Sequence, residues 1–310
     1  MSLGPDLPRN WYLLGPSKVL PRGHILSQSI GGRSIVIYRG QDDGRPVAFT
    51  AQCAHMGCHL GKGAVVGNSL RCGLHHRLIN ADGRFERDRN GDLQQETFLV
   101  EDFMGGLFVH LGDKAAARPL VELGLQETAS CYAGEHAFPL TWQSLVANGL
   151  DIDHLSAVHD RTLLGEPLID WPHPDEFRLR YVTRPSARKV PDRVINWLAP
   201  DGIHGSIRSI SGTMMLVESR VGSRDTFILM SFCPDDAGET LIRGLVGIKG
   251  SASLTNRISA RVARALFKAF LHKDLHVLEG LRWHEPAFEH SFGDRAMRDV
   301  ASFFRGLPRA

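Results

Sequence analysis

Cys53-Ala-His55, separated by sixteen residues from Cys72-Gly-Leu-His75, is the stretch on which the interpretation of this chain depends. It supplies two thiols and two imidazoles as two short pairs. Such a set can hold a structural zinc ion. It can equally hold a two-iron cluster in which the cysteines bind one iron and the histidines bind the other. The alternatives differ in function, because zinc has no redox chemistry whereas an iron–sulfur cluster carries single electrons.

Composition and charge limit the classes of protein to consider. The chain has 310 residues, enough for one large domain or two ordinary ones, and 43% of them are apolar. With 36 basic and 34 acidic residues, the net charge of +2 gives no reason to expect nucleic acid or an anionic membrane as a partner. No apolar run reaches the ~20 residues of a membrane helix, and the first residues lack the pattern of an export signal. We therefore expect a cytoplasmic protein with neither kind of partner.

The chain divides into two parts with different sequence patterns. Residues 8–115 contain short β-branched and aromatic runs separated by glycine, which predicts a small all-β domain with the Cys/His pairs on two loops. The expected strands include residues 34–39, 46–50 and 106–111, with turns at 82–83 and 90–92. We place the domains at residues 1–116 and 117–310.

The second part mixes helix and strand patterns. Residues 140–160 are compatible with a helix, and residues 176–250 contain strand-like runs, among them 226–232 and 241–248. Residues 252–284 predict the longest helix, which Pro286 would end. The fold class is therefore α+β.

The residues around the Cys/His pairs resemble a Rieske domain, from Cys53-Ala-His-Met-Gly-Cys-His-Leu60 to Cys72-Gly-Leu-His75. The resemblance covers roughly residues 8–115. It implies that Cys53 and Cys72 bind one iron of a [2Fe–2S] cluster and that His55 and His75 bind the other. A structural zinc site is the alternative.

The loops also separate branches of that family. Cys58 stands where respiratory Rieske proteins have one bridging cysteine, but Leu74 stands at the second such position, so that disulfide cannot form. The chain is therefore similar to the oxygenase or ferredoxin type. It departs from oxygenases after the last ligand, where His76 and Arg77 replace the usual glycine and aromatic residue.

A second constellation reads Asn148-x-x-Asp151-x-x-His154, with His159 five residues further on. A spacing of five rotates the two imidazoles by about 140° around a helix, so the helix must distort or end between them if both are to bind one ion. Asp151 and His154 are three residues apart and share a helix face, where the carboxylate could accept the second ring N–H of His154.

Two histidines and one carboxylate form the facial triad of non-haem Fe(II) oxygenases. Asp274 is the best candidate for the carboxylate, and Glu279 and Asp294 are weaker ones. The pattern with His154 and His159 resembles the mononuclear iron motif of Rieske non-haem iron oxygenases, so that the resemblance spans nearly the whole chain.

This resemblance implies a terminal oxygenase component with a helix-grip catalytic domain, an antiparallel sheet wrapped by helices. It would take electrons from a ferredoxin or flavin reductase, since the chain has no G-x-G-x-x-G motif for a nicotinamide or flavin cofactor. It would use O₂ at Fe(II) to hydroxylate, demethylate or desaturate a small organic substrate, and the short chain favours a monooxygenase over a dioxygenase.

The resemblance also implies a homotrimer in which His75 of one subunit meets Asp151 of the next, with Asn148 close to the iron. Two other functions remain open. One is an electron-transfer protein with an inactive second domain, and the other is a zinc-binding interaction module.

Overall fold

Two compact units make up the described chain, and each is described by itself. The first comprises residues 1–117, 234–238 and 309–310, and the second comprises residues 118–233 and 239–308. The predicted domains at residues 1–116 and 117–310 stay a prediction. The computed structural model describes residues 7–86, 93–125, 128–186, 190–250, 260, 261, 263–265, 267, 268, 271, 274, 277–287 and 291–310.

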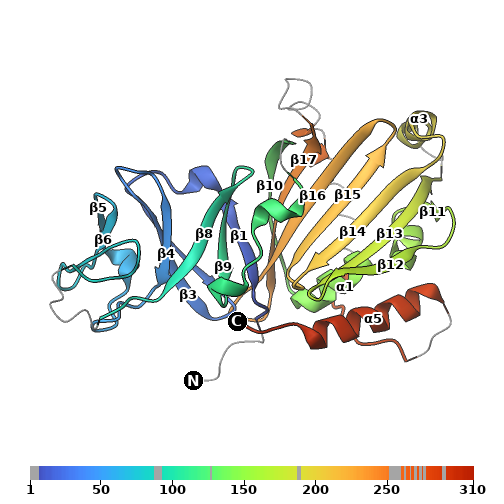
Figure 1. Ribbon diagram of the computed structural model, residues 1–310. Helices are drawn as coiled ribbons and strands as arrows, with labels where there is room; N and C mark the ends of the chain where they lie inside the picture. Colours follow the sequence, from blue (N-terminus) through green and yellow to red (C-terminus); the bar gives the residue numbers. More distant parts are fainter. Residues whose placement is uncertain are drawn as a thin grey trace. The chain divides into compact units, whose positions relative to one another are not determined.

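The first unit contains two antiparallel sheets (Figure 1). The six-stranded sheet has the order β1-β9-β8-β4-β3-β2 and the three-stranded sheet the order β5-β6-β7. The strands are β1 (Asn10–Pro16), β2 (Ile25–Ile30), β3 (Arg33–Arg39), β4 (Pro46–Thr50), β5 (Ala64–Val66), β6 (Ser69–Arg71), β7 (Leu78–Ile79), β8 (Thr97–Phe103) and β9 (Gly106–Leu111). Short 3₁₀ turns are η1 (Ser17–Val19), η2 (Leu60–Lys62), η3 (Lys114–Ala116) and η4 (Leu120–Leu123), the last in the second unit.

The three strands predicted in the first unit are confirmed. The turn at 82–83 is also confirmed, and its sequence has a physical reason. Gly83 has φ +82°, and a Cβ there would lie 2.3 Å from the carbonyl oxygen of Gln95, so only glycine fits. The turn predicted at 90–92 lies outside the described residues. One apolar cluster connects the two sheets and includes both Cys53 and Cys72.

The second unit is built on an antiparallel sheet with the order β10-β17-β16-β15-β14-β13-β11, and β12 pairs with β13 (Figure 1). The predicted strands at 226–232 and 241–248 are confirmed within β16 and β17. The strands are β10 (Thr128–Phe138), β11 (Arg161–Leu163), β12 (Leu168–His173), β13 (Glu176–Pro185), β14 (Ile203–Ile210), β15 (Met214–Val221), β16 (Arg224–Pro234) and β17 (Thr240–Lys249).

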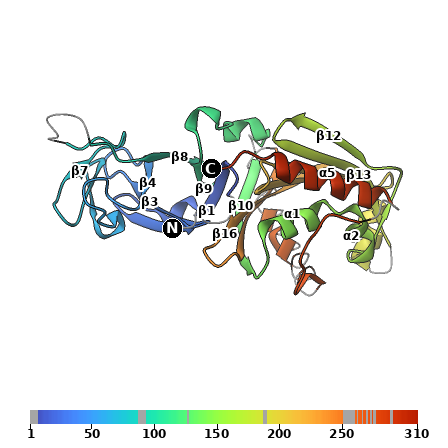
Figure 2. The same cartoon turned by 90° about the horizontal axis from the view of Figure 1, so that it is seen from below.

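Helices cover the apolar face of this sheet. The helices with defined bounds are α1 (Trp142–Leu150), α2 (Ile152–Ala157), α3 (Val190–Leu198) and α5 (Phe292–Gly306). α1 and α5 pack against each other (Figure 2), and the rings of Trp142 and Phe304 meet at 5.1 Å between centroids. The core of the unit lies between these helices and the strands.

The helix predicted over 252–284 differs from the structure at its end. The described residues between 260 and 278 are helical, but the chain turns at Glu279 and Gly280, so Pro286 does not end the helix. Gly280 has φ +77°, and a glycine in this conformation is a common helix terminator. Residues 252–259 lie outside the described part. Among the described residues, no helix combines the length and apolar character needed to cross a bilayer.

Candidate metal centres

The two Cys/His loops of the first unit share one backbone design. The N–H of Cys53 donates to the carbonyl of Cys58 (2.9 Å), and the N–H of Gly57 donates to the carbonyl of Cys53 (2.7 Å). The second loop repeats both bonds. The N–H of Cys72 donates to the carbonyl of Arg77 (2.9 Å), and the N–H of His76 donates to the carbonyl of Cys72 (3.0 Å). Each cysteine is thus fixed at the start of a closed turn, which directs its thiol and the following histidine toward the other loop.

This repeat explains the unusual residue after the last candidate ligand. Gly57 and His76 occupy the same place in their loops, and both have positive φ, +72° and +55°. A left-handed conformation costs a non-glycine residue roughly 1 kcal/mol. His76 therefore adopts a backbone conformation that suits glycine, and its exposed side chain stands where the resemblance leads one to expect none.

The four candidate ligands meet as two pairs. The thiols of Cys53 and Cys72 hydrogen-bond each other, and both residues are buried. The rings of His55 and His75 lie 4.9 Å apart between centroids, with His75 exposed. The two cysteines and the two histidines thus pair by type, as the ligands of a Rieske [2Fe–2S] cluster do.

The surroundings of His55 and Cys72 favour the protonation states that metal binding requires, whereas burial raises the pKa of Cys53. Desolvation, together with the positive charge of Arg77, lowers the pKa of His55 and favours neutral imidazole. Burial alone would raise the pKa of Cys72, but hydrogen bonds from the backbone N–H groups of Leu74 and His75 outweigh it and lower the pKa. The loop backbone therefore stabilises a thiolate at Cys72.

The remaining cysteines are free thiols. Cys58 is half-buried and hydrogen-bonds Cys72. Leu74, at the position where respiratory Rieske proteins have the second bridging cysteine, is 51% exposed. In the second unit, burial raises the pKa values of Cys131 and Cys233. This agrees with inert thiols at both positions.

The second constellation lies where one expected helix becomes two. α1 ends at Leu150, and Asp151 breaks the helix with ψ +108° before α2 begins. α2 then ends at Ala157, so the helix stops between His154 and His159, which is one of the two possibilities that their spacing left open. Asp160, with φ +53°, turns the chain into β11.

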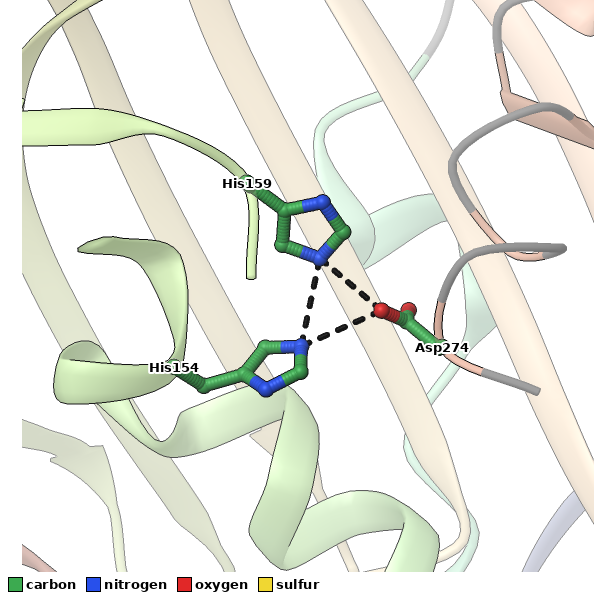
Figure 3. Close-up of side chains that lie close together, drawn as sticks. All are labelled: His154, His159 and Asp274. Atoms are coloured by element: carbon green, nitrogen blue, oxygen red, sulfur yellow. Dashed lines mark hydrogen bonds and ion pairs between the residues drawn. The ribbon is translucent and has the colours of Figure 1, made fainter. Parts of the chain in front are cut away.

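His154, His159 and Asp274 converge on one point (Figure 3). The two Nε2 atoms are 3.2 Å apart, and Oδ1 of Asp274 lies 3.1 Å from His154 and 2.9 Å from His159. Ligands held about 2.1 Å from an ion at right angles lie about 3.0 Å from one another, while tetrahedral ligands lie about 3.4 Å apart. The observed triangle fits three ligands on one face of an octahedron.

The structure also chooses among the three carboxylates considered for this site. Asp274 is a helical residue and is buried, with 7% of its surface exposed. Glu279 is exposed in the following turn, and Asp294 caps α5. Burial would raise the pKa of Asp274, but hydrogen bonds from His154 and His159 lower it below its usual range. The carboxylate is therefore held ionised, as a metal ligand must be.

Asp151 and Asn148 lie just before this site. The Asp151 carboxylate caps α2 by accepting the N–H of Asp153 at 3.0 Å, and burial raises its pKa. No hydrogen bond from the His154 ring to Asp151 occurs among the described contacts. The Asn148 carbonyl accepts the N–H of Asp151 at 3.3 Å. The electron-bridging role of Asp151 and the proximity of Asn148 to iron stay predictions.

Four arginines on the strands of the second unit pair with carboxylates. Arg178 donates to Asp170 (2.6 Å), Arg208 to Glu176 (2.6 Å) and Arg220 to Asp225 (2.7 Å). Arg180 also reaches Asp170, at 3.0 Å.

Residues 10–96 match the family model of the Rieske [2Fe–2S] domain. Among curated proteins, the chain is 28% identical over 176 residues to cholesterol 7-desaturase nvd of Bombyx mori, covering 53% of this chain and 38% of that protein. It is also 28% identical over 145 residues to the oxygenase component of 3-ketosteroid-9-alpha-monooxygenase of Mycolicibacterium smegmatis, covering 46% and 37%. The chain thus spans about two fifths of the length of these relatives.

The fold extends the similarity over the whole chain. Dicamba monooxygenase bound to dicamba superposes with a TM-score of 0.65 at 16% identity, covering 96% of each chain. NdmA of Pseudomonas putida CBB5 with caffeine superposes with a TM-score of 0.70 at 19% identity, covering 96% of this chain and 90% of that one. The chain therefore contains a Rieske [2Fe–2S] domain over residues 10–96, and its fold over nearly its whole length is that of dicamba monooxygenase and NdmA.

Proposed function

We propose that the chain is the terminal oxygenase component of a Rieske system and acts on a small organic molecule as a monooxygenase. One observation carries the proposal: His154, His159 and Asp274 form a buried triangle with edges of 2.9–3.2 Å in the unit that follows a Rieske domain. An electron carrier with an inactive second domain would have no use for this arrangement. The relatives named above, a desaturase and monooxygenases, support the same class.

The bound groups would supply the redox chemistry: a [2Fe–2S] cluster carries single electrons and Fe(II) activates O₂. Cys53, Cys72, His55 and His75 would hold the cluster. The exposed His75 edge would receive or pass on electrons, while the buried cysteines anchor the cluster in the core.

In the second unit, three ligands on one face would leave the opposite coordination positions for O₂ and substrate. His159 at 6% exposure and Asp274 at 7% keep bulk water away from the ligands. The Asp274 carboxylate would balance part of the charge of a bound metal ion. Its lowered pKa lets it do so without taking up a proton.

The partners and assembly belong to this proposal as well. A ferredoxin or a flavin reductase would supply electrons, since no dinucleotide motif occurs in the chain. A cytoplasmic homotrimer would place His75 of one subunit beside Asp151 of the next, with Asn148 near the iron. The raised pKa of Asp151 suits a group that shares a proton with a histidine.

Iron analysis and spectroscopy of the purified protein test the proposal. We expect a red-brown protein with about three irons per chain and a Rieske EPR signal on reduction. We also expect O₂ consumption that depends on a reductase and a substrate. Two irons per chain would instead indicate an electron carrier, and a colourless protein with zinc would indicate an interaction module.

A further inference from the structure

Helix α2 carries His154, yet it is only six residues long. Isolated helices of this length are not stable in water, so its position must come from contacts with the rest of the unit. One contact is apolar: Ile152 is 1% exposed and belongs to the core. A second contact joins Asp153, the residue before the candidate ligand, to the beginning of α5.

The hydroxyl of Ser291 makes this second contact. Ser291 is the N-cap of α5, and its Oγ accepts the N–H of Asp294 at 3.0 Å. The same Oγ donates its single proton to Oδ2 of Asp153 at 3.1 Å. The Asp294 carboxylate accepts the N–H of Ser291 at 3.0 Å and completes a capping box. The cap of α5 therefore has one hydrogen bond left to give, and it goes to α2.

Gly293 makes room for the carboxylate. A Cβ at this residue would lie 2.2 Å from Oδ2 of Asp153 and 2.8 Å from its Cγ, so any other residue would displace Asp153. The carboxylate lies against the positive end of a 15-residue helix, where a negative charge is favoured. Met297, Val300 and Phe304 pack α5 into the core of the unit, so its first turn is held in place by that packing.

We propose that Ser291 and Gly293 are positioning residues for the metal site, acting on His154 through Asp153. The backbone N–H of Asp153 also holds the carboxylate of Asp151, so one residue connects α5, the cap of α2 and the candidate ligand. This inference rests on the proposed function, since it assumes that His154 binds iron.

Equilibrium binding of Fe(II) tests the inference. The protein is first depleted of the mononuclear ion, with the cluster left in place and quantified by its absorbance. It is then dialysed anaerobically against Fe(II), and the iron bound in excess of the cluster is measured. Ser291→Ala and Gly293→Ala should each weaken Fe(II) binding about 10-fold, within the 10–100-fold range usual for groups that orient ligands. Ser291→Thr keeps the hydroxyl and should restore wild-type affinity.

Asp294→Ala is the matched control. It removes the other half of the capping box and weakens α5 to a similar degree, but leaves the bond between Ser291 and Asp153. It should lower the melting temperature as much as Ser291→Ala while binding Fe(II) within 2-fold of wild type. Equal affinities for wild type, Ser291→Ala and Gly293→Ala would overturn the inference, as would equal loss in Asp294→Ala. A wild-type protein that binds no Fe(II) beyond its cluster would overturn the proposed function itself, and this inference with it.

Discussion

Arg208→Met should destabilise the second unit far more than Arg220→Met, although both remove an ion-paired arginine from neighbouring strands. Arg208 donates to Glu176 at 2.6 Å, and the two side chains are 14% and 1% exposed. Arg220 donates to Asp225 at 2.7 Å, but those side chains are 63% and 38% exposed. Loss of one partner from a buried pair costs about 3–5 kcal/mol, and an exposed pair contributes at most about 1 kcal/mol.

The structure places the cost for Arg208→Met at the low end of this range. Arg118 remains 3.0 Å from the second oxygen of Glu176 and still compensates part of its charge. We expect a loss of about 3 kcal/mol, which lowers the melting temperature of a unit of this size by about 6–12 °C. Tryptophan fluorescence follows the second unit, which holds four of the five tryptophans, and visible absorbance follows the cluster in the first.

The pH dependence gives a second measure of the same interaction. Burial would raise the pKa of Glu176, but hydrogen bonds from Arg208 and Arg118 lower it below its ordinary value. A carboxylate whose pKa is depressed by folding contributes stability above its unfolded pKa of about 4.3, and loses it as the pH falls through the folded pKa. The difference in the free energy of unfolding between wild type and Arg208→Met should therefore be at its full value at neutral pH and should shrink below about pH 4. The reasoning is refuted if Arg208→Met and Arg220→Met unfold within about 0.5 kcal/mol of each other at pH 7.

Three further outcomes can be measured, two that concern the metal sites and one that concerns the sheet of the second unit. Asp274→Ala should lower the iron content from about three to two per chain and leave the reduced Rieske EPR spectrum unchanged, because the two ligand sets lie in different units; a lost cluster signal would contradict this separation. Asp151→Asn should keep all three irons while turnover with a reductase falls at least 10-fold, and unchanged turnover would remove its role as an electron bridge. Gly205→Ala should destabilise the second unit by about 1–3 kcal/mol in urea unfolding, because the new Cβ would lie 2.5 Å from the ring of Tyr181; an unchanged midpoint would show that the ring can move.

The candidate Cys/His ligands of the first site could be predicted from sequence because their spacing is set by local chemistry. Cys53 and His55, and likewise Cys72 and His75, are close in the chain, so one turn per pair presents them together. The strands could also be predicted from sequence, since runs such as residues 46–50 and 106–111 are rich in β-branched and aromatic residues. The ends of helices were harder to predict. The sequence pattern predicted a helix that continues to Pro286, whereas the helix ends at Gly280, which has a left-handed backbone conformation.

The start of α5 carries a sequence signal of its own. Ser291-Phe-Gly-Asp294 is a capping-box sequence before an amphipathic segment, which predicts a helix start. Its contact with Asp153 could not be predicted, because the two segments are 138 residues apart and only the packing of α5 on the core brings them together.

The sequence by itself determined the class of this protein: a Rieske domain with its four ligands, followed by two histidines and a choice of carboxylates for a second ion. The sequence favoured Asp274 over Glu279 and Asp294, but only the tertiary structure brings its Oδ1 to 3.1 Å from His154 and 2.9 Å from His159. It also decided that the helix ends between His154 and His159, and that α5 supports the helix carrying the first of them. Residue types and short spacings state which chemistry is available, but burial and distance between remote segments depend on the packing of the whole unit.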